Sequence, residues 1–185
     1  MHIAPPTQTP ATRDLLYDPL TIALHWTTAV LIGLLWLIGQ TVDFAPSGPL
    51  RVDYRSLHIL FGVTLFGVFV ARVTWRLRRG RSLPGVGDML MELVARLTHW
   101  ALYLLILSAL GLGLANVWVR GDAIFNLFTV PAFDPGNKGL RALIGHWHAL
   151  AANAMLILAG VHAAAALFHH FILRDGVLRR MLPMV

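Results

Sequence analysis

Histidine is the residue type that offers the clearest chemistry in this sequence, because imidazole ligates metals and exchanges protons near neutral pH. Nine histidines occur among the 185 residues. Eight of them lie within or at the edges of long apolar segments: His25, His58, His99, His146, His148, His162, His169 and His170. Ionisable residues inside a membrane are costly and are therefore functional candidates. A lone histidine is better explained by an interhelical hydrogen bond, so the functional interpretation depends on how the histidines are grouped.

Two of these histidines have a spacing that predicts two cofactor sites at different depths. His148 and His162 are 14 residues apart, which is nearly four helical turns and about 21 Å along one helix face. In a chain that crosses the membrane four times, His58 lies at the depth of His148, and His25 lies at the depth of His162. Paired imidazoles on facing helices can ligate a low-spin haem iron. We therefore expect two haems, held by His58 with His148 and by His25 with His162.

The remaining histidines have weaker assignments. His99 falls near the depth of His25 and could compete with it as a ligand, or it could contact a quinone or support a ligand without touching the iron. His146 is two residues from His148, so it points elsewhere on the helix and is expected at the membrane interface. His169, His170 and Arg174 lie near a membrane boundary. They are either ordinary interfacial residues or the groups that bind a quinone and exchange protons with it.

Haem propionates need cations, and two arginines are candidates for that role. Arg72 follows His58 by 14 residues, and Arg141 precedes His148 in the fourth apolar segment. Snorkelling of the side chain to the membrane surface explains either residue equally well. Small residues that let a flat macrocycle approach a helix are Gly62, Gly67, Gly111, Gly113 and Gly160. Close helix packing is the simpler explanation for each glycine taken alone.

The elements that position these residues are predicted from composition. Hydrophobic residues make up 57% of the chain and charged residues 13%, too few to cover a soluble domain of this length. Four apolar segments reach the roughly 20 residues needed to cross a bilayer: Leu20–Val42, His58–Trp75, Leu93–Val119 and Leu143–Leu173. Backbone groups in lipid must bond within their own segment, so these segments are helices. We expect an all-α integral membrane four-helix bundle over residues 19–185, preceded by a flexible cytoplasmic tail at residues 1–18.

Charge and residue usage exclude several classes of protein. The 15 basic residues exceed the nine acidic ones, but they lie between apolar segments, which favours membrane orientation over nucleic-acid binding. Most lie in the second loop and the termini, so both termini are expected in the cytoplasm. The absence of cysteine excludes disulfides, cysteine-ligated iron–sulfur clusters and covalent haem attachment. The apolar segments carry no carboxylate in their cores, which argues against a proton pump or hard-cation transporter.

An ordered set of motifs runs along most of the chain, from Tyr17 onward. It comprises Leu24-His25-Trp26, His58 followed by Gly62, Ala71-Arg72, His99 before Leu102-Tyr103-Leu104, Trp147-His148, His162-Ala163-Ala164-Ala165-Ala166, His169-His170, Arg174-Asp175 and Arg180-Met181-Leu182-Pro183. With these motifs the sequence resembles the bacterial cytochrome b561 family, within a wider group that includes hydrogenase cytochrome b subunits. The resemblance implies two b-type haems, the same four histidine ligands, a bacterial inner-membrane location and electron exchange with the quinone pool.

Within that family the sequence looks most like enzymes that oxidise superoxide and reduce ubiquinone. A collar of basic residues in the first and third loops would focus such an anion toward one membrane face. The candidates are Arg51, Arg55, Arg120, Lys138 and Arg141. Contact with lipid headgroups explains each of these residues equally well when it is taken alone.

Three functions are compatible with these observations. The first is a free-standing superoxide:ubiquinone oxidoreductase, which is favoured because only the third loop is long enough to dock a protein. The second is a membrane-anchor electron-transfer subunit for a partner dehydrogenase or hydrogenase. The third is a histidine-based transporter of copper, zinc or nickel. The lack of cysteine, methionine-rich motifs and membrane carboxylates weighs against that transporter.

Overall fold

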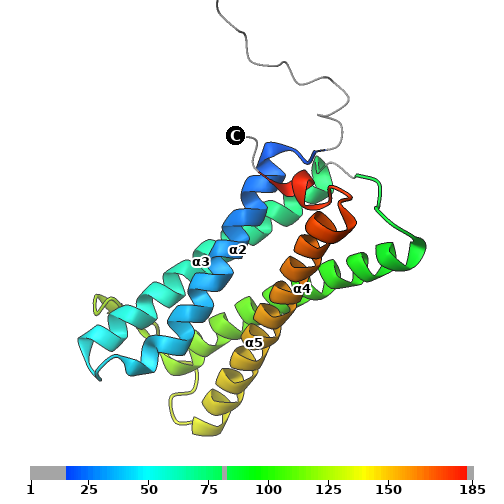
Figure 1. The fold of residues 1–185 in the computed structure, drawn as a ribbon. Coiled ribbons are helices and arrows are strands. Elements are labelled where there is room, and N and C mark those ends of the chain that lie inside the picture. The colour runs from blue at the N-terminus through cyan, green and yellow to red at the C-terminus, as the bar shows by residue number, and fades with distance from the viewer. Residues whose placement is uncertain (1–15, 81–82, 183–185) are drawn as a thin grey trace, which may run out of the picture.

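The computed structural model describes residues 16–80 and 83–182, and its main elements are four long helices (Figure 1). They are α2 (Pro19–Thr41), α3 (Pro49–Arg78), α4 (Met89–Arg120) and α5 (Lys138–Phe168). Within the described residues, these four helices are long and apolar enough to cross a membrane. The predicted all-α membrane four-helix bundle is therefore confirmed. Residues 1–15 of the predicted N-terminal tail lie outside the described part of the chain.

Shorter elements complete the described chain. A 3-10 turn, η1 (Val42–Phe44), follows α2, and a π-helical turn, η2 (His169–Leu173), continues α5. A second 3-10 turn, η3 (Leu178–Met181), closes the described chain. Between α4 and α5, β1 (Ala123–Ile124) pairs antiparallel with β2 (Phe128–Thr129).

The helices begin where the sequence supplies caps. Asp18 accepts a hydrogen bond from the Thr21 N–H at the start of α2, and Asp88 accepts one from the Met91 N–H at the start of α4. Asn137 does the same for α5 through the Leu140 N–H. These side chains satisfy backbone donors that a helix start leaves without partners.

Helix α3 departs most from the range that the sequence predicts. Helix α3 begins at Pro49, nine residues before the expected start at His58, so the first loop is shorter than expected. Gly48 has a φ of 124° and reverses the chain, and Pro49 has a backbone angle suited to the first helical position. Hydropathy marks only the lipid-buried part of a helix, so it missed the polar turns that carry Arg51 and Arg55.

The bundle consists of two helical hairpins. Helix α2 packs along α3, and α4 packs along α5, whereas the two hairpins touch each other sparingly. An apolar core at mid-bundle joins them: Leu31, Ile32, Leu35, Leu65, Phe69, Ile106 and Met155. One polar tie adds to this core, since the Trp36 indole N–H donates to Asn153 Oδ1 over 2.8 Å, linking α2 to α5.

The strand pair between α4 and α5 is fastened to the first turns of α3. Buried Ser56 Oγ accepts a hydrogen bond from the Phe125 N–H at 2.7 Å. Asp53 Oδ1 accepts one from Asn126 at 3.1 Å. This segment therefore closes the end of the bundle formed by the first and third loops, here called the loop-three end.

The opposite end brings both ends of the described chain together with the second loop, and is here called the terminal end (Figure 1). The Tyr17 N–H donates to the Arg180 carbonyl, and the Trp26 indole donates to the Met181 carbonyl over 2.7 Å. Arg180 in turn donates to the Pro84 carbonyl of the second loop. The η3 turn is thereby tied both to α2 and to the second loop.

Candidate functional site

Two histidines from different hairpins face each other at the loop-three end. His58 on α3 and His148 on α5 have ring centroids 6.1 Å apart. The Ala109 carbonyl on α4 lies 3.0 Å from His148 Nδ1 and accepts its proton. This bond places the ring proton on Nδ1 and leaves the Nε2 lone pair free, which is the usual arrangement of a metal-ligating histidine.

Glycines on the other two helices make room for these rings. A Cβ at Gly113 on α4 would lie 3.1 Å from His148 Cε1, and one at Gly39 on α2 would lie 3.4 Å from His58 Cε1. His58 Nδ1 is buried and has no hydrogen-bond partner among the described residues. The pair is thus enclosed by one residue from each of the four helices.

The glycines expected from the sequence fall into two groups. Gly113 packs against a histidine ring, whereas Gly62, Gly67, Gly111 and Gly160 have open space where a Cβ would stand. Gly39 was not among the sequence candidates. Its neighbours carry no histidine signal, and its role follows only from how α2 lies against α3.

A second group of histidines lies toward the terminal end. His25 on α2 and His162 on α5 have ring centroids 6.5 Å apart. Arg72 on α3 places Nη2 3.1 Å from His25 Nδ1, and its guanidinium carbon stands 5.4 Å from the centre of the Tyr103 ring. Helix α5 is continuous from His148 to His162, so the two groups are separated by about 21 Å along it.

His99 on α4 joins this second group. Its ring centroid is 5.3 Å from that of His162, closer than His25. Among the described residues, no three side chains of His, Asp or Glu converge in a way that would hold a bare metal ion. The question is therefore which two of the three rings would face a common iron.

Ring separation tests whether each pair fits a haem iron. With metal–nitrogen bonds of about 2 Å, two imidazoles in trans have centroids roughly 6.3 Å apart. The separations of 6.1 Å for His58–His148 and 6.5 Å for His25–His162 both fall close to this value. The His99–His162 separation of 5.3 Å is about 1 Å short of it. The donor sets of the first two pairs therefore fit the group better.

The two neighbouring histidines at the end of α5 have different surroundings. His169 Nδ1 is hydrogen-bonded to Asp175 Oδ2. His170 instead lines a pocket of about 270 Å³ with Phe171, Arg174, Gly176 and Arg179. His146 is exposed on α5, away from the His148 ring contacts.

The basic residues of the loop-three end are partly neutralised. Buried Asp122 contacts two arginines, Arg55 at 3.2 Å and Arg120 at 3.4 Å. Arg51 lies 4.0 Å from Asp43 and donates to the Ala45 carbonyl. The five cations of this end are matched by four aspartates, at positions 43, 53, 122 and 134. The net charge there is therefore smaller than the basic residues alone suggested.

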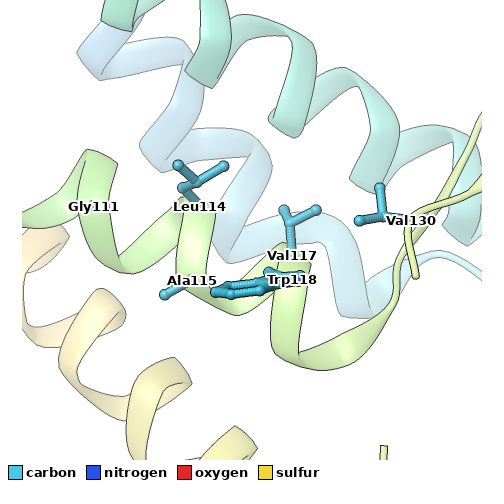
Figure 2. A pocket seen from close by; sticks show the side chains of 6 residues that line it. All are labelled: Gly111, Leu114, Ala115, Val117, Trp118 and Val130. Atoms are coloured by element: carbon cyan, nitrogen blue, oxygen red, sulfur yellow. The ribbon is translucent and has the colours of Figure 1, made fainter. Parts of the chain in front are cut away.

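An apolar pocket of about 470 Å³ lies on α4 near this end, lined by Leu114, Val117, Trp118 and Val130 among others (Figure 2). Its lining also includes Gly111 and Ala115. At about 100° per residue, most of these positions point away from the Gly113 face that meets His148. No titratable side chain lines it, so we assign it no part in the chemistry.

Comparison with known proteins identifies relatives over nearly the whole chain. The model of the family described as prokaryotic cytochrome b561 matches residues 16–184. A probable superoxide oxidase CybB of Yersinia pestis is 30% identical over 171 residues, covering 90% of this chain and 96% of that protein. Cytochrome b562 of Cereibacter sphaeroides is 32% identical, covering 90% and 94%. Cytochrome b561 homolog 1 of Escherichia coli is 30% identical, covering 88% and 94%.

Proposed function

Because this chain belongs to the prokaryotic cytochrome b561 family, a family of membrane electron carriers that bind b-type haem, we propose that it holds two haems in series. His58 and His148 would hold the haem iron at the loop-three end, and His25 and His162 would hold the iron at the terminal end. The observation that carries this proposal is the pair of ring separations, 6.1 and 6.5 Å, on one continuous α5 helix. When bound, the haems supply one-electron chemistry at two depths of the membrane.

Arg72 is the proposed partner of a propionate at the terminal-end site. A guanidinium that donates to His25 Nδ1 requires this nitrogen to be unprotonated, which leaves the ring proton on Nε2. Ligation through Nε2 requires the opposite tautomer. Arg72 must then find another acceptor, and a haem propionate is a suitable anion beside it.

Arg141 is the corresponding candidate at the loop-three end. It precedes His148 by seven residues, two turns along the same face of α5. Arg55 and Arg120 share Asp122, so together these three groups still carry one net positive charge. This charge and Arg141 support binding of an anion at this end.

The proposed donor at the loop-three end is superoxide, and the proposed acceptor at the terminal end is ubiquinone. Two superoxide ions give up two electrons and become two molecules of dioxygen. One quinone takes up those electrons with two protons and becomes a quinol. A relative over 90% of the chain is named a probable superoxide oxidase, and the basic residues at the loop-three end suit a small anion.

The quinone site is proposed at the end of α5, among His169, His170 and Arg174. These side chains supply hydrogen-bond donors for quinone oxygens close to the terminal-end histidines. Among the described residues, the terminal end also carries eight basic side chains against four acidic ones. The positive-inside rule therefore supports a bacterial inner membrane with both termini in the cytoplasm.

The test is a haem count followed by a superoxide pulse. We expect a pyridine haemochrome assay to give two b haems per chain, reduced by superoxide and reoxidised by ubiquinone. Replacing His58 or His25 by alanine should remove one haem, whereas His99→Ala should retain both. His146→Ala is the matched control, because this exposed histidine lies beside the His148 site without facing it.

Other results would each contradict a different part of the proposed function. A single haem in the unaltered protein would overturn the paired arrangement, and loss of a haem in His99→Ala would make His99 the ligand. Two haems that respond to a quinol but ignore superoxide would replace the enzyme with a membrane-anchor subunit for a partner dehydrogenase or hydrogenase.

A further inference from the structure

The last turn of α5 is irregular in a way that brings two titratable groups together. After Phe168 the helix widens into the π-helical turn η2, and Arg174 then takes a left-handed conformation with φ of 54°. Such a backbone is uncommon for a residue other than glycine. Single π turns often occur at functional sites. Here the irregular turn folds Asp175 back beside the first residue of η2, His169.

His169 and Asp175 form a hydrogen-bonded dyad. His169 Nδ1 donates to Asp175 Oδ2, while Asp175 Oδ1 accepts from the Val177 N–H at 3.1 Å. The two side chains are only 23% and 18% exposed. With Nδ1 held by the carboxylate, the ring orientation is fixed and Nε2 is the nitrogen available for proton transfer.

The position of His169 places it on the face of α5 that carries His162. His169 follows His162 by seven residues, so it lies on nearly the same face of α5 and about 10 Å farther toward the terminal end. His170 lies on another side of the helix, in the basic pocket with Arg174 and Arg179. Of the two neighbouring histidines, His169 is thus the one aligned with the terminal-end ligand.

We propose that His169 is the proton donor for quinone reduction and that Asp175 is the positioning residue that orients it. This inference rests on the proposed function. In the reaction the quinone accepts two electrons that came from the donor at the loop-three end, and the Nε2 proton of the His169 imidazolium moves to a carbonyl oxygen. This transfer leaves a neutral imidazole whose proton on Nδ1 stays bonded to Asp175. The C=O bond becomes a C–O–H group. His169 regains a proton from solvent at the terminal end, and the second carbonyl, on the opposite side of the quinone ring, takes its proton from solvent.

The charge on Asp175 supports this role. Partial burial would raise the pKa of Asp175, but hydrogen bonds from His169 and the Val177 N–H and the nearby Arg180 charge together lower it below its usual value. The carboxylate is therefore ionised at neutral pH and accepts the Nδ1–H hydrogen bond that orients the imidazole.

The test follows reoxidation of the chemically reduced, haem-loaded protein by a short-chain ubiquinone in stopped flow. We expect Asp175→Asn to slow reoxidation about tenfold and His169→Ala about 100-fold, with haem content and reduction by dithionite unchanged. Asp175→Glu should recover most of the rate. Added imidazole should accelerate His169→Ala, which a merely structural defect would not allow. Asp134→Asn, a carboxylate change at the loop-three end, is the matched control and should react like the unaltered protein.

Each contrary result has a separate meaning. Reoxidation of Asp175→Asn at the unaltered rate would overturn the dyad and leave the proposed function standing. If Asp175→Asn loses haem, its reoxidation rate cannot be interpreted, and the proposal is tested by adding imidazole to His169→Ala. If imidazole does not accelerate reoxidation of that variant, the proposal is wrong. If ubiquinone fails to reoxidise the unaltered protein, both the proposed function and the dyad are wrong.

Discussion

Gly113 and Gly39 show how closely the fold fits around the histidine rings at the loop-three end. Each glycine lies on a helix that carries neither histidine of that pair, yet the ring of His148 or His58 rests against it. A glycine in a helix costs roughly 1 kcal/mol relative to alanine. At these two positions that cost is offset by the room that the glycine leaves for an imidazole.

The first prediction concerns these contacts. Gly113→Ala places a Cβ 3.1 Å from His148 Cε1, so the ring must shift, and we expect haem affinity at this site to fall about tenfold. Gly39→Ala, at 3.4 Å from His58 Cε1, should have a weaker effect. Haem titration followed by the Soret band measures both.

Gly33→Ala on α2 is the control, since nothing lies within 4 Å of its Cβ position. It should bind haem normally and be slightly more stable. Equal affinities for all three variants would show that the glycines do not shape the site.

At the scale of the helices, α5 sets the depth of both sites and α2 is anchored at the terminal end. Asp18 accepts hydrogen bonds from the Thr21 N–H and hydroxyl and from the Trp75 indole N–H on α3 over 2.9 Å. The same carboxylate thus caps α2 and ties it to α3. The hairpin formed by these helices carries His25, His58 and Arg72, so its geometry bears on both sites.

The second prediction concerns this carboxylate. Burial raises the pKa of Asp18, but the bonds from Thr21 and Trp75 lower it overall, below its usual value near 3.8. A lowered pKa means that its contribution to stability is present above about pH 4 and is lost as the pH falls below that value. We expect Asp18→Asn to flatten the decline in melting temperature between about pH 5 and pH 3, in thermal denaturation in detergent.

Asp88→Asn is the comparison. Asp88 caps α4 by accepting a hydrogen bond from the Met91 N–H, as Asp18 caps α2, so this variant also removes a capping carboxylate. The melting temperature of Asp88→Asn should fall more steeply between about pH 5 and pH 3 than that of Asp18→Asn. Identical acid curves for Asp18→Asn and the unaltered protein would contradict the assignment.

For the whole molecule, the proposed haem sites lie between the two hairpins. The two hairpins contact each other sparingly, apart from the mid-bundle core and the Trp36–Asn153 bond. Each proposed ligand pair joins one histidine of the α2–α3 hairpin to one of the α4–α5 hairpin. A bound haem would therefore hold the hairpins together as well as carry electrons.

The third prediction follows from this arrangement. Protein produced under haem limitation should melt at least about 10 °C lower than the loaded form, because a tightly bound group adds about 4 kcal/mol or more to stability. Differential scanning fluorimetry before and after haem addition measures the difference. A change in melting temperature below about 2 °C would show that the hairpins are held together without haem.

Much of this protein follows from the sequence, because the evidence for it is local. Apolar runs of spanning length require helices in lipid, and the 14-residue interval from His148 to His162 determines their shared face whatever surrounds α5. In a helix that spans the membrane, the position of a residue along the chain gives its depth. Histidines on other helices at the depths of His148 and His162 could therefore be identified by counting residues. The extra turns of α3 were missed because a helix can continue past the boundary that hydropathy detects.

Other features depend on how the helices are rotated and packed against one another, which no interval along the chain specifies. Gly39 beside His58, His99 beside His162 and Arg72 beside His25 are contacts of this kind. The pairing of His169 with Asp175 requires a π-helical turn and a left-handed arginine, a backbone that local propensity disfavours. Such a backbone persists only where surrounding contacts stabilise it, so the tertiary structure alone decided which of the two adjacent histidines faces a carboxylate.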